Sequence, residues 1–322
     1  MNKVSVIIPL YNAMPFFKET IDSVLRQTQD NLELIVIDDG STDGALEHLE
    51  ALNLPNLIIT SNKGKGACAA RNYGFQLSSG DYIQYLDADD LLSETKIETQ
   101  VNLLKNNPKS IAVCSTKHFY NTIDNGKITD RPFLESTNNP KELLLNLFGA
   151  DGKTQNMVQT SAWLTPRTLI EEAGPWDERL KKDQDGEFFC RVVTKAENVL
   201  YSPTVLNYYR KHVGGSNIAS QKKRIHLESQ LKALNSKAKQ FSGLEKTQAY
   251  NNAMALQYKV LAINAYPKFK DFAKVCLNRS SEYGGSKYLP VLGGRIIEII
   301  KTILGWKIAK SFSYWVHKID FR

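Results

Sequence analysis

The spacing of apolar and polar residues divides the first third of the chain into short apolar runs separated by amphipathic stretches. The runs are rich in β-branched residues and apolar on both faces, which predicts buried strands at 4–10, 32–38, 56–60, 81–87 and 110–116. The stretches between them place apolar residues at helical spacing, which predicts helices at 14–28, 44–52, 66–78 and 93–107. Such alternation favours the α/β class, with a doubly wound, mostly parallel sheet.

Beyond about residue 125 the alternation becomes irregular. The elements expected there are a strand, a short helix and a loop at 159–180, a helix at 183–196, and a strand interrupted by Pro203 at 198–212. From about residue 220 the pattern is helical and rich in lysine. We therefore expect a sheet domain at 1–217 and a helical C-terminal extension at 218–322.

The net charge of +7 is unevenly distributed along the chain. Residues 221–322 hold 19 Lys and Arg against 6 Asp and Glu, a net charge of +13. Residues 1–220 hold 22 against 28, a net charge of −6. This asymmetry indicates that the two parts of the chain have different partners. The four cysteines are far apart and form no C-x-x-C pair, so neither a disulfide framework nor a zinc site is indicated.

The chain lacks the signals of secretion and of a membrane-spanning segment. No apolar run reaches about 18 residues, which excludes a spanning helix. The N-terminus enters strand-like sequence at once, without a cleavage site of small residues, and this predicts a cytoplasmic protein. No recognised nucleic-acid-binding motif accompanies the basic charge, so nucleic acid is not an expected partner.

The stretch 296–316 predicts an amphipathic helix. One apolar stripe is formed by Ile296, Ile299, Ile300, Ile303, Leu304, Ile308, Phe312, Trp315 and Val316, and Glu298 and three lysines lie off it. A basic helix of this kind suits an anionic membrane surface, here the inner face of the cell membrane. The alternatives are packing on the core of this protein or on a second subunit of a homo-oligomer.

Polar residues follow three of the predicted strands. The first strand runs into Pro9-Leu10-Tyr11-Asn12, the second into residues 38–43, and the fourth into Asp87-Ala88-Asp89-Asp90. In parallel sheets, ligands bind outside the carboxyl ends of the strands. A mostly acidic edge disfavours an anionic ligand unless a cation is bound there too.

The D-x-D of Asp87 and Asp89 is the strongest candidate for that cation. Two carboxylates on one turn can reach a hard divalent ion, which prefers oxygen ligands and can bridge a diphosphate. The alternative is a polar turn that caps the next helix. At the second strand end, Asp39 could accept from a nucleobase or a ribose hydroxyl, whereas helix capping alone explains Ser41 and Thr42.

The stretch 64–74 contains G-x-G-x-x-A, the pattern of a dinucleotide-binding fingerprint. That fingerprint should follow the first strand of the sheet, whereas this one follows the third, so NAD is not expected. Lys65 and Arg71 could instead serve a phosphate near the start of the helix.

The N-terminal pattern resembles glycosyltransferase family 2, the nucleotide-sugar enzymes of the A-type fold. The resemblance covers residues 4 to about 217 and is carried by six blocks in the right order. These are VSVIIPLYN at 4–12, IDDGSTD at 37–43, GACAARNYG at 66–74, DYIQYLDADD at 81–90, GPWDERLKKDQDGEFFCRV at 174–192 and YRKHVGGS at 209–216. Together they are far more specific than any one block.

The resemblance implies roles for the matching residues. Pro9, Tyr11 and Asp39 would hold the base, with Tyr11 against its face, and Arg71 would lie by the nucleotide. The cofactor implied is Mn²⁺ or Mg²⁺. The implied metal ligand is Asp89, and Asp87 would lie near the ribose or the metal. His212 matches a histidine that contacts the metal in some relatives; the alternative is that it has a structural role.

The general base of the family falls at Asp185 of this sequence. The family usually has Glu-Asp there, and Gln184 replaces the Glu, while Asp183 is close enough to compete for the role. The resemblance thus implies metal-dependent, inverting transfer of a sugar from a nucleoside-diphosphate sugar, with a UDP-sugar favoured. The acceptor implied is a hydroxyl of a glycan or lipid-linked molecule, and the product a bacterial surface polysaccharide.

Two other functions stay open. A nucleotidyltransferase would normally show a Gly-rich, basic N-terminal loop, which is absent here. A sugar-nucleotide-binding or scaffolding protein would have a degenerate site, and the intact D-x-D together with Asp185 counts against it.

Overall fold

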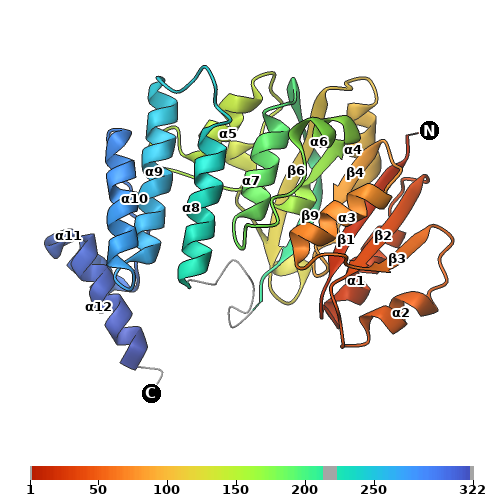
Figure 1. The fold of residues 1–322 in the computed structure, drawn as a ribbon, viewed down its shortest axis with the longest axis horizontal. Helices are drawn as coiled ribbons and strands as arrows, with labels where there is room; N and C mark the ends of the chain where they lie inside the picture. The colour runs from red at the N-terminus through yellow and green to blue at the C-terminus, as the bar shows by residue number, and fades with distance from the viewer. Residues whose placement is uncertain (1, 213–222, 320–322) are drawn as a thin grey trace. The chain divides into compact units, whose positions relative to one another are not determined.

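The chain folds into two compact units, which Figure 1 shows as ribbons. The computed structural model describes residues 2–212 and 223–319, with side chains up to residue 316. The sheet unit contains Met1–Leu143 and Met157–Asn217. The helical unit contains Leu144–Asn156 and Ile218–Arg322, so a segment that precedes residue 217 belongs to it.

Four parallel strands form the first half of the sheet. β1 lies between β2 and β4, and β3 pairs with the other side of β2. Leu10 is opposite Asp38 in the register, so β1 and β2 end side by side, and β4 ends at the same edge. The four strands are β1 (Val4–Leu10), β2 (Leu32–Asp38), β3 (Leu57–Ser61) and β4 (Tyr82–Tyr85).

The second half of the sheet is mixed. The sequence predicted a mostly parallel sheet that includes 110–116, but β8 separates this strand, β6, from β4 and runs antiparallel to both. β6 and β9 then pair in parallel along the whole of β6. The α/β fold is therefore as predicted, with a return strand in its middle. The bounds are β5 (Leu91–Leu92), β6 (Ser110–Phe119), β7 (Lys127–Ile128), β8 (Trp163–Pro166) and β9 (Asn198–Arg210).

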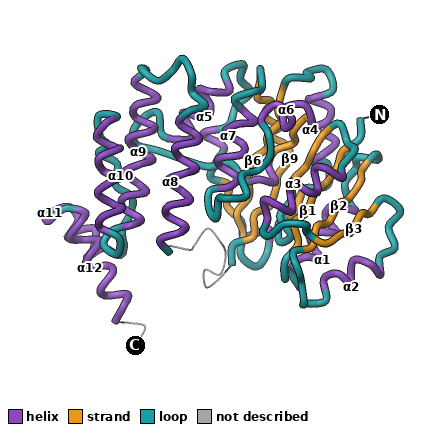
Figure 2. Tube along the Cα trace, in the orientation of Figure 1, coloured by secondary structure: helices purple, strands orange, loops and turns teal. Residues whose placement is uncertain are grey.

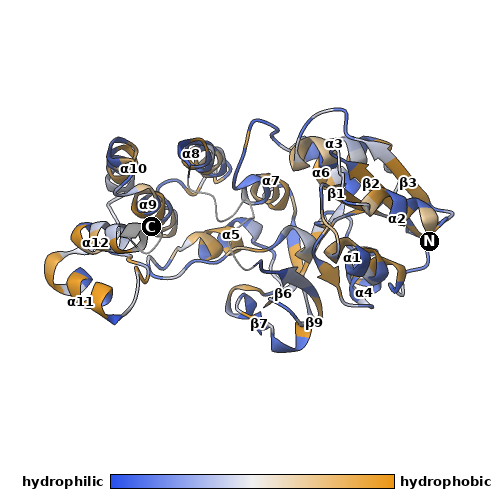
Figure 3. Ribbon diagram, turned by 90° about the horizontal axis from the view of Figure 1, so that it is seen from below, coloured by the Kyte–Doolittle hydropathy of each residue, from blue (hydrophilic) through white to orange (hydrophobic). Residues whose placement is uncertain are grey.

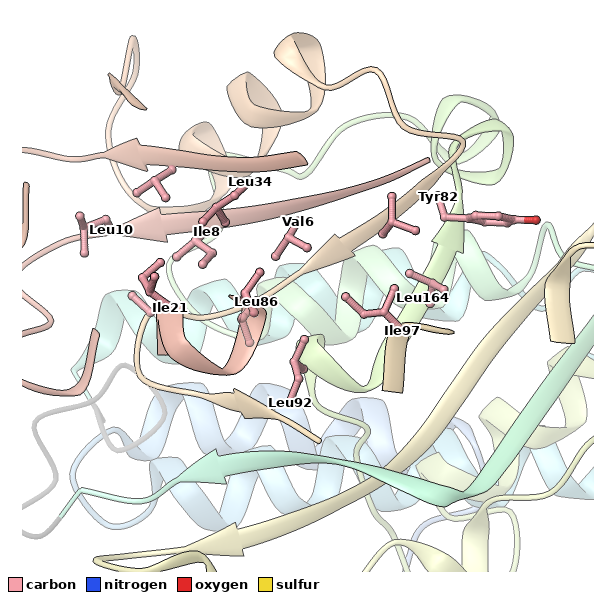
Figure 4. Close-up of a cluster of buried hydrophobic side chains, with 14 of the residues drawn as sticks. Val6, Ile8, Leu10, Ile21, Leu34, Tyr82, Leu86, Leu92, Ile97 and Leu164 are labelled. Carbon is pink, nitrogen blue, oxygen red and sulfur yellow. The ribbon is translucent and has the colours of Figure 1, made fainter. Parts of the chain in front are cut away.

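Helices cover both faces of the parallel half, with α1 and α4 on one face and α3 and α6 on the other (Figure 3). Side chains alternate along a strand, so Val6, Ile8 and Leu10 share one face of β1. They form a core with Ile21 of α1 and Ile97 of α4 (Figure 4). The helices of this unit are α1 (Phe16–Leu25), α2 (Ala45–Ala51), α3 (Ala67–Leu77), α4 (Lys96–Leu104), α6 (Arg167–Ala173) and α7 (Gln184–Val193).

The other face of β1 packs closely against α3. A Cβ atom at Gly74 would lie 2.4 Å from Cγ2 of Ile7, so the helix can cross the strand at this distance only with a glycine there. α3 begins after Gly66, whose φ of 87° lies in the left-handed region that favours glycine. These two glycines hold α3, which carries Arg71, against the centre of the sheet.

The described residues of the helical unit include two small clusters of buried apolar side chains. Leu227, Leu261 and Phe272 are buried together from α8, α9 and α10, and Ile297 and Ala309 secure α11 and α12. Within the described residues, no helix is both long and apolar enough to cross a bilayer. The helices, drawn in purple in Figure 2, are α8 (Arg224–Ala238), α9 (Gln248–Ala265), α10 (Lys270–Glu282), α11 (Arg295–Leu304) and α12 (Trp306–Ile319).

Three local features differ from the sequence-based expectation. The helix expected at 296–316 is two helices, because Gly305 between them has a φ of 83°. Pro203 does not interrupt β9; instead the register with β6 shifts, and the strand bulges. No element was predicted over α5 (Pro140–Phe148), and the short 3-10 helices were not predicted either. These are Ile123–Asn125, Arg131–Phe133 and Thr160–Ala162.

All four cysteines are buried free thiols. Burial raises the pKa of the Cys68 thiol to about 12. A thiol with so high a pKa is a poor nucleophile. The cysteines are therefore core residues and not part of the candidate site.

Candidate active site

The loops that follow β1 and β2 are joined by hydrogen bonds between side chains and backbone. Asn12, which has a left-handed backbone (φ 45°), donates its N–H to Oγ of Ser41 at 3.1 Å. Its side-chain oxygen accepts from the N–H of Thr42 at 2.8 Å. The carboxylate of Asp43 accepts from the N–H of Met14 at 2.7 Å. The two loops therefore form one continuous rim at the end of the sheet.

The two acids that end β2 have different local roles. Asp38 is buried, and its carboxylate accepts from the N–H groups of Gly40 and Ser41. This turn explains Asp38 without any ligand. The carboxylate of Asp39 accepts from Nδ2 of Asn62 at 2.8 Å and from the N–H of Gly66 at 2.9 Å. Asp39 thus ties the end of β2 to the start of α3.

The predicted base-binding residues lie together at this rim. Pro9 is half-buried in β1, opposite Ile37 in the register, so Tyr11 and Asp39 follow adjacent strand ends. The side chain of Tyr11 is 63% exposed. An exposed ring beside a fixed carboxylate is a combination that can stack on a base and accept from it.

The two carboxylates of the D-x-D after β4 contact two different basic side chains. Oδ1 of Asp87 accepts from Nη2 of Arg71 at 2.5 Å, and Oδ2 of Asp89 lies 2.6 Å from Nε2 of His212. Both carboxylates are about one-third exposed, at 32% and 33%. The structure therefore brings together four of the residues that the sequence predicted. Residues 213–216, the end of the predicted YRKHVGGS block, lie outside the described residues.

Negative charge is concentrated in this loop. Asp90 is buried, and its carboxylate accepts from Oγ of Ser161 and from the N–H of Arg210, both at 3.1 Å. Burial, with a further contribution from Asp89 and Asp87, raises the pKa of Asp90 well above its usual value. Burial also raises the pKa of Asp89, against the hydrogen bond to His212. A bound cation would relieve this accumulation of charge.

Arg210, at the end of β9, supports the loop and was not among the predicted site residues. Its guanidinium is buried, and Nε donates to the carbonyl oxygen of Asp89 at 3.1 Å while Nη2 donates to Glu19 at 2.7 Å. The rings of Phe16 and Phe119 each lie 4.6 Å from its Cζ atom. Arg210 thus fixes the backbone that carries the second carboxylate of the D-x-D.

An aromatic group lies beneath Arg71. Cζ of Arg71 is 4.5 Å from the centroid of the Trp176 ring. That ring stacks on Phe188 of α7 at 4.0 Å and meets the edge of Tyr85 at 5.2 Å. The stack aims Arg71 at Asp87 and joins α3 to the first turns of α7.

Asp185 lies in the first turn of α7. Burial raises its pKa, Asp183 and Asp87 raise it further, and Arg71 lowers it. Asp185 is therefore close enough to the D-x-D and to Arg71 for their charges to act on it. A carboxylate with a raised pKa is a stronger proton acceptor than an exposed one.

The residues around Asp185 shape the start of α7. Gln184, which replaces the Glu of the family pattern, donates its side-chain amide to the carbonyl of Leu180 at 2.7 Å. A carboxylate could not donate this bond. Glu187 is buried and pairs with Arg191 at 2.8 Å, and Arg191 also donates to the carbonyl oxygen of Ala173. Glu187 is therefore a structural acid of the helix.

The donor atoms at the D-x-D fit a divalent cation. Two carboxylates and an imidazole are suitable ligands for Mn²⁺ or Mg²⁺. The contacts to Arg71 and His212 each use one oxygen of a carboxylate. Within the described residues, no three such side chains converge as a complete metal site. Asp87, Asp89 and His212 would therefore need further ligands from a bound molecule.

A family comparison decides the class of this chain. The family model described as Glycosyl transferase family 2 matches residues 5–169, just over half of the chain. The chain belongs to glycosyltransferase family 2. The matched region contains the D-x-D and Arg71, and it ends before Asp185 and His212.

Relatives carry the same family name. A protein of Rickettsia bellii described as an uncharacterized glycosyltransferase is 31% identical over 228 residues, which are 70% of this chain and 32% of its own length. The uncharacterized glycosyltransferase alr2836 of Nostoc sp. is 29% identical over an alignment 340 residues long, which covers 99% of this chain and 94% of that one. This family 2 chain therefore spans only about a third of the Rickettsia bellii protein.

Solved structures share the fold. Residues 1–349 of S. aureus TarS, in complex with UDP-GlcNAc, align over 90% of this chain and 94% of that one, with a TM-score of 0.61 and 17% identity. Mannosyltransferase PcManGT from Pyrobaculum calidifontis, in complex with GDP-Man and Mn²⁺, aligns over 97% and 85%, with a TM-score of 0.52 and 18% identity. This likeness confirms the predicted glycosyltransferase fold with helices after the sheet.

Proposed function

We propose that this chain is an inverting glycosyltransferase that moves a sugar from a nucleoside-diphosphate sugar to a hydroxyl of a glycan or lipid-linked acceptor. The observation that carries the proposal is the convergence of two functions at one place. Asp87 and Asp89, held by Arg71 and His212, would receive the leaving diphosphate. Asp185 lies in the first turn of the helix that packs on the same aromatic group as Arg71.

The nucleotide would bind across the ends of β1 and β2. Tyr11 offers an exposed ring to the base beside Pro9, and Asp39 offers a carboxylate that hydrogen bonds already hold in place. Arg71 would lie by the nucleotide and contribute positive charge next to the diphosphate. We favour a UDP-sugar; the TarS structure contains UDP-GlcNAc, whereas the PcManGT structure contains GDP-Man.

Asp89, Asp87 and His212 would hold Mn²⁺ or Mg²⁺, which when bound supplies counter-charge for the departing diphosphate. The presence of Mn²⁺ in the PcManGT structure supports this assignment. Arg210 contributes by fixing the carbonyl of Asp89, so the carboxylate is in place before a donor arrives. Such preorganised charge is a major source of rate enhancement.

Asp185 would accept the proton of the acceptor hydroxyl as its oxygen attacks the anomeric carbon. The new C–O bond forms while the bond to the diphosphate oxygen breaks, and the proton goes to Asp185. Acceptor and leaving group are on opposite faces of the sugar, so a single displacement inverts the anomeric centre. The raised pKa of Asp185 suits it to this role.

We further propose that the product is a bacterial surface polysaccharide made in the cytoplasm. The two relatives described above come from bacteria. In this chain, residues 1–220 are acidic overall and residues 221–322 are basic. An acidic donor site and a basic C-terminal region are consistent with an acceptor that is presented at an anionic surface.

A donor screen on the full chain tests the proposal. The protein is mixed with UDP-, GDP- and dTDP-sugars, with and without Mn²⁺, and both thermal stabilisation and release of nucleoside diphosphate are measured. We expect one donor to stabilise the protein in the presence of Mn²⁺ and to be slowly hydrolysed without acceptor. Stabilisation with no release would favour a binding or scaffolding protein. Release of pyrophosphate from a nucleoside triphosphate and a sugar phosphate would favour a nucleotidyltransferase.

A further inference from the structure

The two C-terminal helices carry a row of exposed, large apolar side chains. On α11 they recur at i, i+3 and i+7, and on α12 at i, i+4 and i+7, so each set lies on one face of its helix. Their exposed fractions range from 46% to 73%. We call them the outer row, and they are Ile296, Ile299, Ile303, Ile308, Phe312 and Trp315.

The inward faces of these helices pack on the helical unit. Among the residues with described side chains, the buried positions are Ile297 in α11 and Ala309 and Ser313 in α12. Ile297 and Ala309 form a small core with Ile263 and Leu292. A helix that only packs on its own protein normally turns its largest apolar side chains inward. α12 packs Trp306 against this core but leaves Ile308, Phe312 and Trp315 exposed to solvent, as α11 leaves Ile296, Ile299 and Ile303.

Gly305 interrupts the helix that carries the outer row, so the row lies on two short helices. Its φ of 83° lies in the left-handed region, where glycine is favoured. α11 has 10 residues and α12 has 14, and both contain strongly apolar segments in Figure 3. A bilayer span needs about 20 residues, so helices of this length can meet a membrane only along its surface.

Charge decides between a membrane and a second copy of the chain. Up to residue 316, Glu298 is the single acid in the sequence of these two helices and pairs with Lys301, so Arg295, Lys307 and Lys310 give them a net positive charge. Residues 221–322 carry a net charge of +13. Two such surfaces repel each other, whereas anionic lipid headgroups attract them. Trp315 in the row suits the boundary between headgroups and acyl chains.

We propose that the outer row docks on an anionic membrane surface, with its apolar side chains entering the headgroup–acyl boundary and the neighbouring basic residues contacting lipid phosphates. The docking surface is contained in α11 and α12 and does not depend on the sugar-transfer chemistry. It can therefore be tested without a donor or an acceptor.

The first experiment is co-sedimentation of the full chain with vesicles of phosphatidylcholine, with and without phosphatidylglycerol. We expect at least about tenfold stronger binding to the anionic vesicles, because several basic residues lie near the surface. High salt should release only part of the protein, since the apolar contacts are not screened. No binding to anionic vesicles would overturn the proposal.

A matched pair of variants tests the outer row itself. The triple substitution Ile303→Ser, Ile308→Ser and Phe312→Ser should weaken binding by about tenfold or more. The control is Ile225→Ser with Val275→Ser, which are 55% and 50% exposed in the same unit and lie outside the row. The control should bind as the wild type does. A triple variant that binds equally well would contradict the proposal.

Two further measurements keep the test decisive if the triple variant folds poorly. Lys307→Glu should weaken binding at low salt and have little effect at high salt. In a Trp306→Phe background, which removes the other tryptophan of α12, the emission of Trp315 should shift to shorter wavelength on anionic vesicles, and adding Trp315→Phe should abolish the shift. Trp163 and Trp176 are each only 2% exposed and should not respond. If the wild type ignores vesicles but is a dimer in sedimentation velocity that the triple variant abolishes, the occupant is a second copy.

Discussion

The two units differ in which charged side chains they bury and which apolar side chains they expose. In the sheet unit, Arg71 and Arg210 are only 5% and 3% exposed, and their guanidinium groups pair with Asp87 and Glu19. In the helical unit, Arg224 forms its ion pairs at the surface, and the outer row exposes large apolar groups. In the sheet unit, Arg71 and Arg210 support the D-x-D where we expect the donor, and in the helical unit the outer row is where we expect a membrane.

The contrast has an energetic basis. A buried charge is tolerated only with well-placed partners, because its desolvation costs several kcal/mol. An exposed ion pair contributes little to stability, because water and salt screen it. Substitutions at the buried charges of the sheet unit should therefore have large effects, and comparable substitutions in the helical unit small ones.

The largest effect is expected at the D-x-D. Asp89→Ala removes the carboxylate that would hold the cation beside the diphosphate, so transfer should fall by about 10³-fold or more. The assay is release of nucleoside diphosphate with saturating donor and Mn²⁺. Asp124→Ala, an exposed acid of the same unit, is the control and should retain full activity. Wild-type turnover in Asp89→Ala, or full wild-type activity in excess EDTA, would sink the assignment.

The next largest effect separates two neighbouring acids. Asp185→Asn keeps the shape of the side chain and removes the proton acceptor, which should lower kcat by about 10²–10⁴-fold. Donor binding, followed by thermal stabilisation, should be unchanged, because this residue serves the acceptor. Asp183→Asn is the comparison. A dead Asp183→Asn together with an active Asp185→Asn would move the base to the earlier residue.

A matched pair of arginines tests the contrast between the units directly. Arg210→Met loses the hydrogen bond to the Asp89 carbonyl and should lower the free energy of unfolding by about 2 kcal/mol. It should also weaken the response of donor binding to Mn²⁺, which a purely structural residue would not affect. Arg224→Met should leave the urea midpoint almost unchanged. Equal losses in the two variants would remove the distinction that we draw.

The smallest effect concerns a buried acid of the sheet unit that serves no ligand. Burial disfavours the charge of Glu33, but hydrogen bonds from Lys3, Ser5 and Ser79 outweigh it and lower its pKa to about 2. A lowered pKa stabilises the fold above the unfolded value of about 4.3, and this contribution is lost as pH falls through the folded value. Glu33→Gln should therefore cost about 1 kcal/mol at pH 7. Urea denaturation should show this difference shrinking between about pH 4.5 and 2, and a difference that grows there would contradict it.

Sequence patterns predicted the parallel half of the sheet because each element there is specified by its own run. They did not predict the mixed half, since the place of β8 between β4 and β6 depends on a chain that returns across the sheet. α5 was missed although Pro140 stands at its first position and Leu143, Leu144 and Leu147 follow. Two predictions about whether an element is continuous were wrong. The last helix is interrupted at Gly305, and β9 continues through a bulge near Pro203.

Site residues that belong to short sequence motifs could be predicted, whereas those defined by contacts between distant parts of the chain could not. Asp87, Asp89 and Asp185 belong to short motifs, and the charges of Asp87 and Arg71 act on Asp185 in the structure. Arg210 and Glu19 are 191 residues apart, so no local spacing could have revealed their pair. The turn function of Asp38 was also invisible, because a carboxylate that accepts two backbone N–H groups looks like any other acid in a sequence.

The joined loops after β1 and β2 have a consequence for the kinetics of donor binding. Asn12 and Asp43 hold these loops together in the protein itself, so their conformational entropy is lost during folding rather than at each encounter with a donor. A donor then meets Tyr11 and Asp39 already in position. Association should therefore proceed in a single step, without a slow rearrangement of the rim, and Asn12→Gly should convert it into a two-step process with a slower second phase.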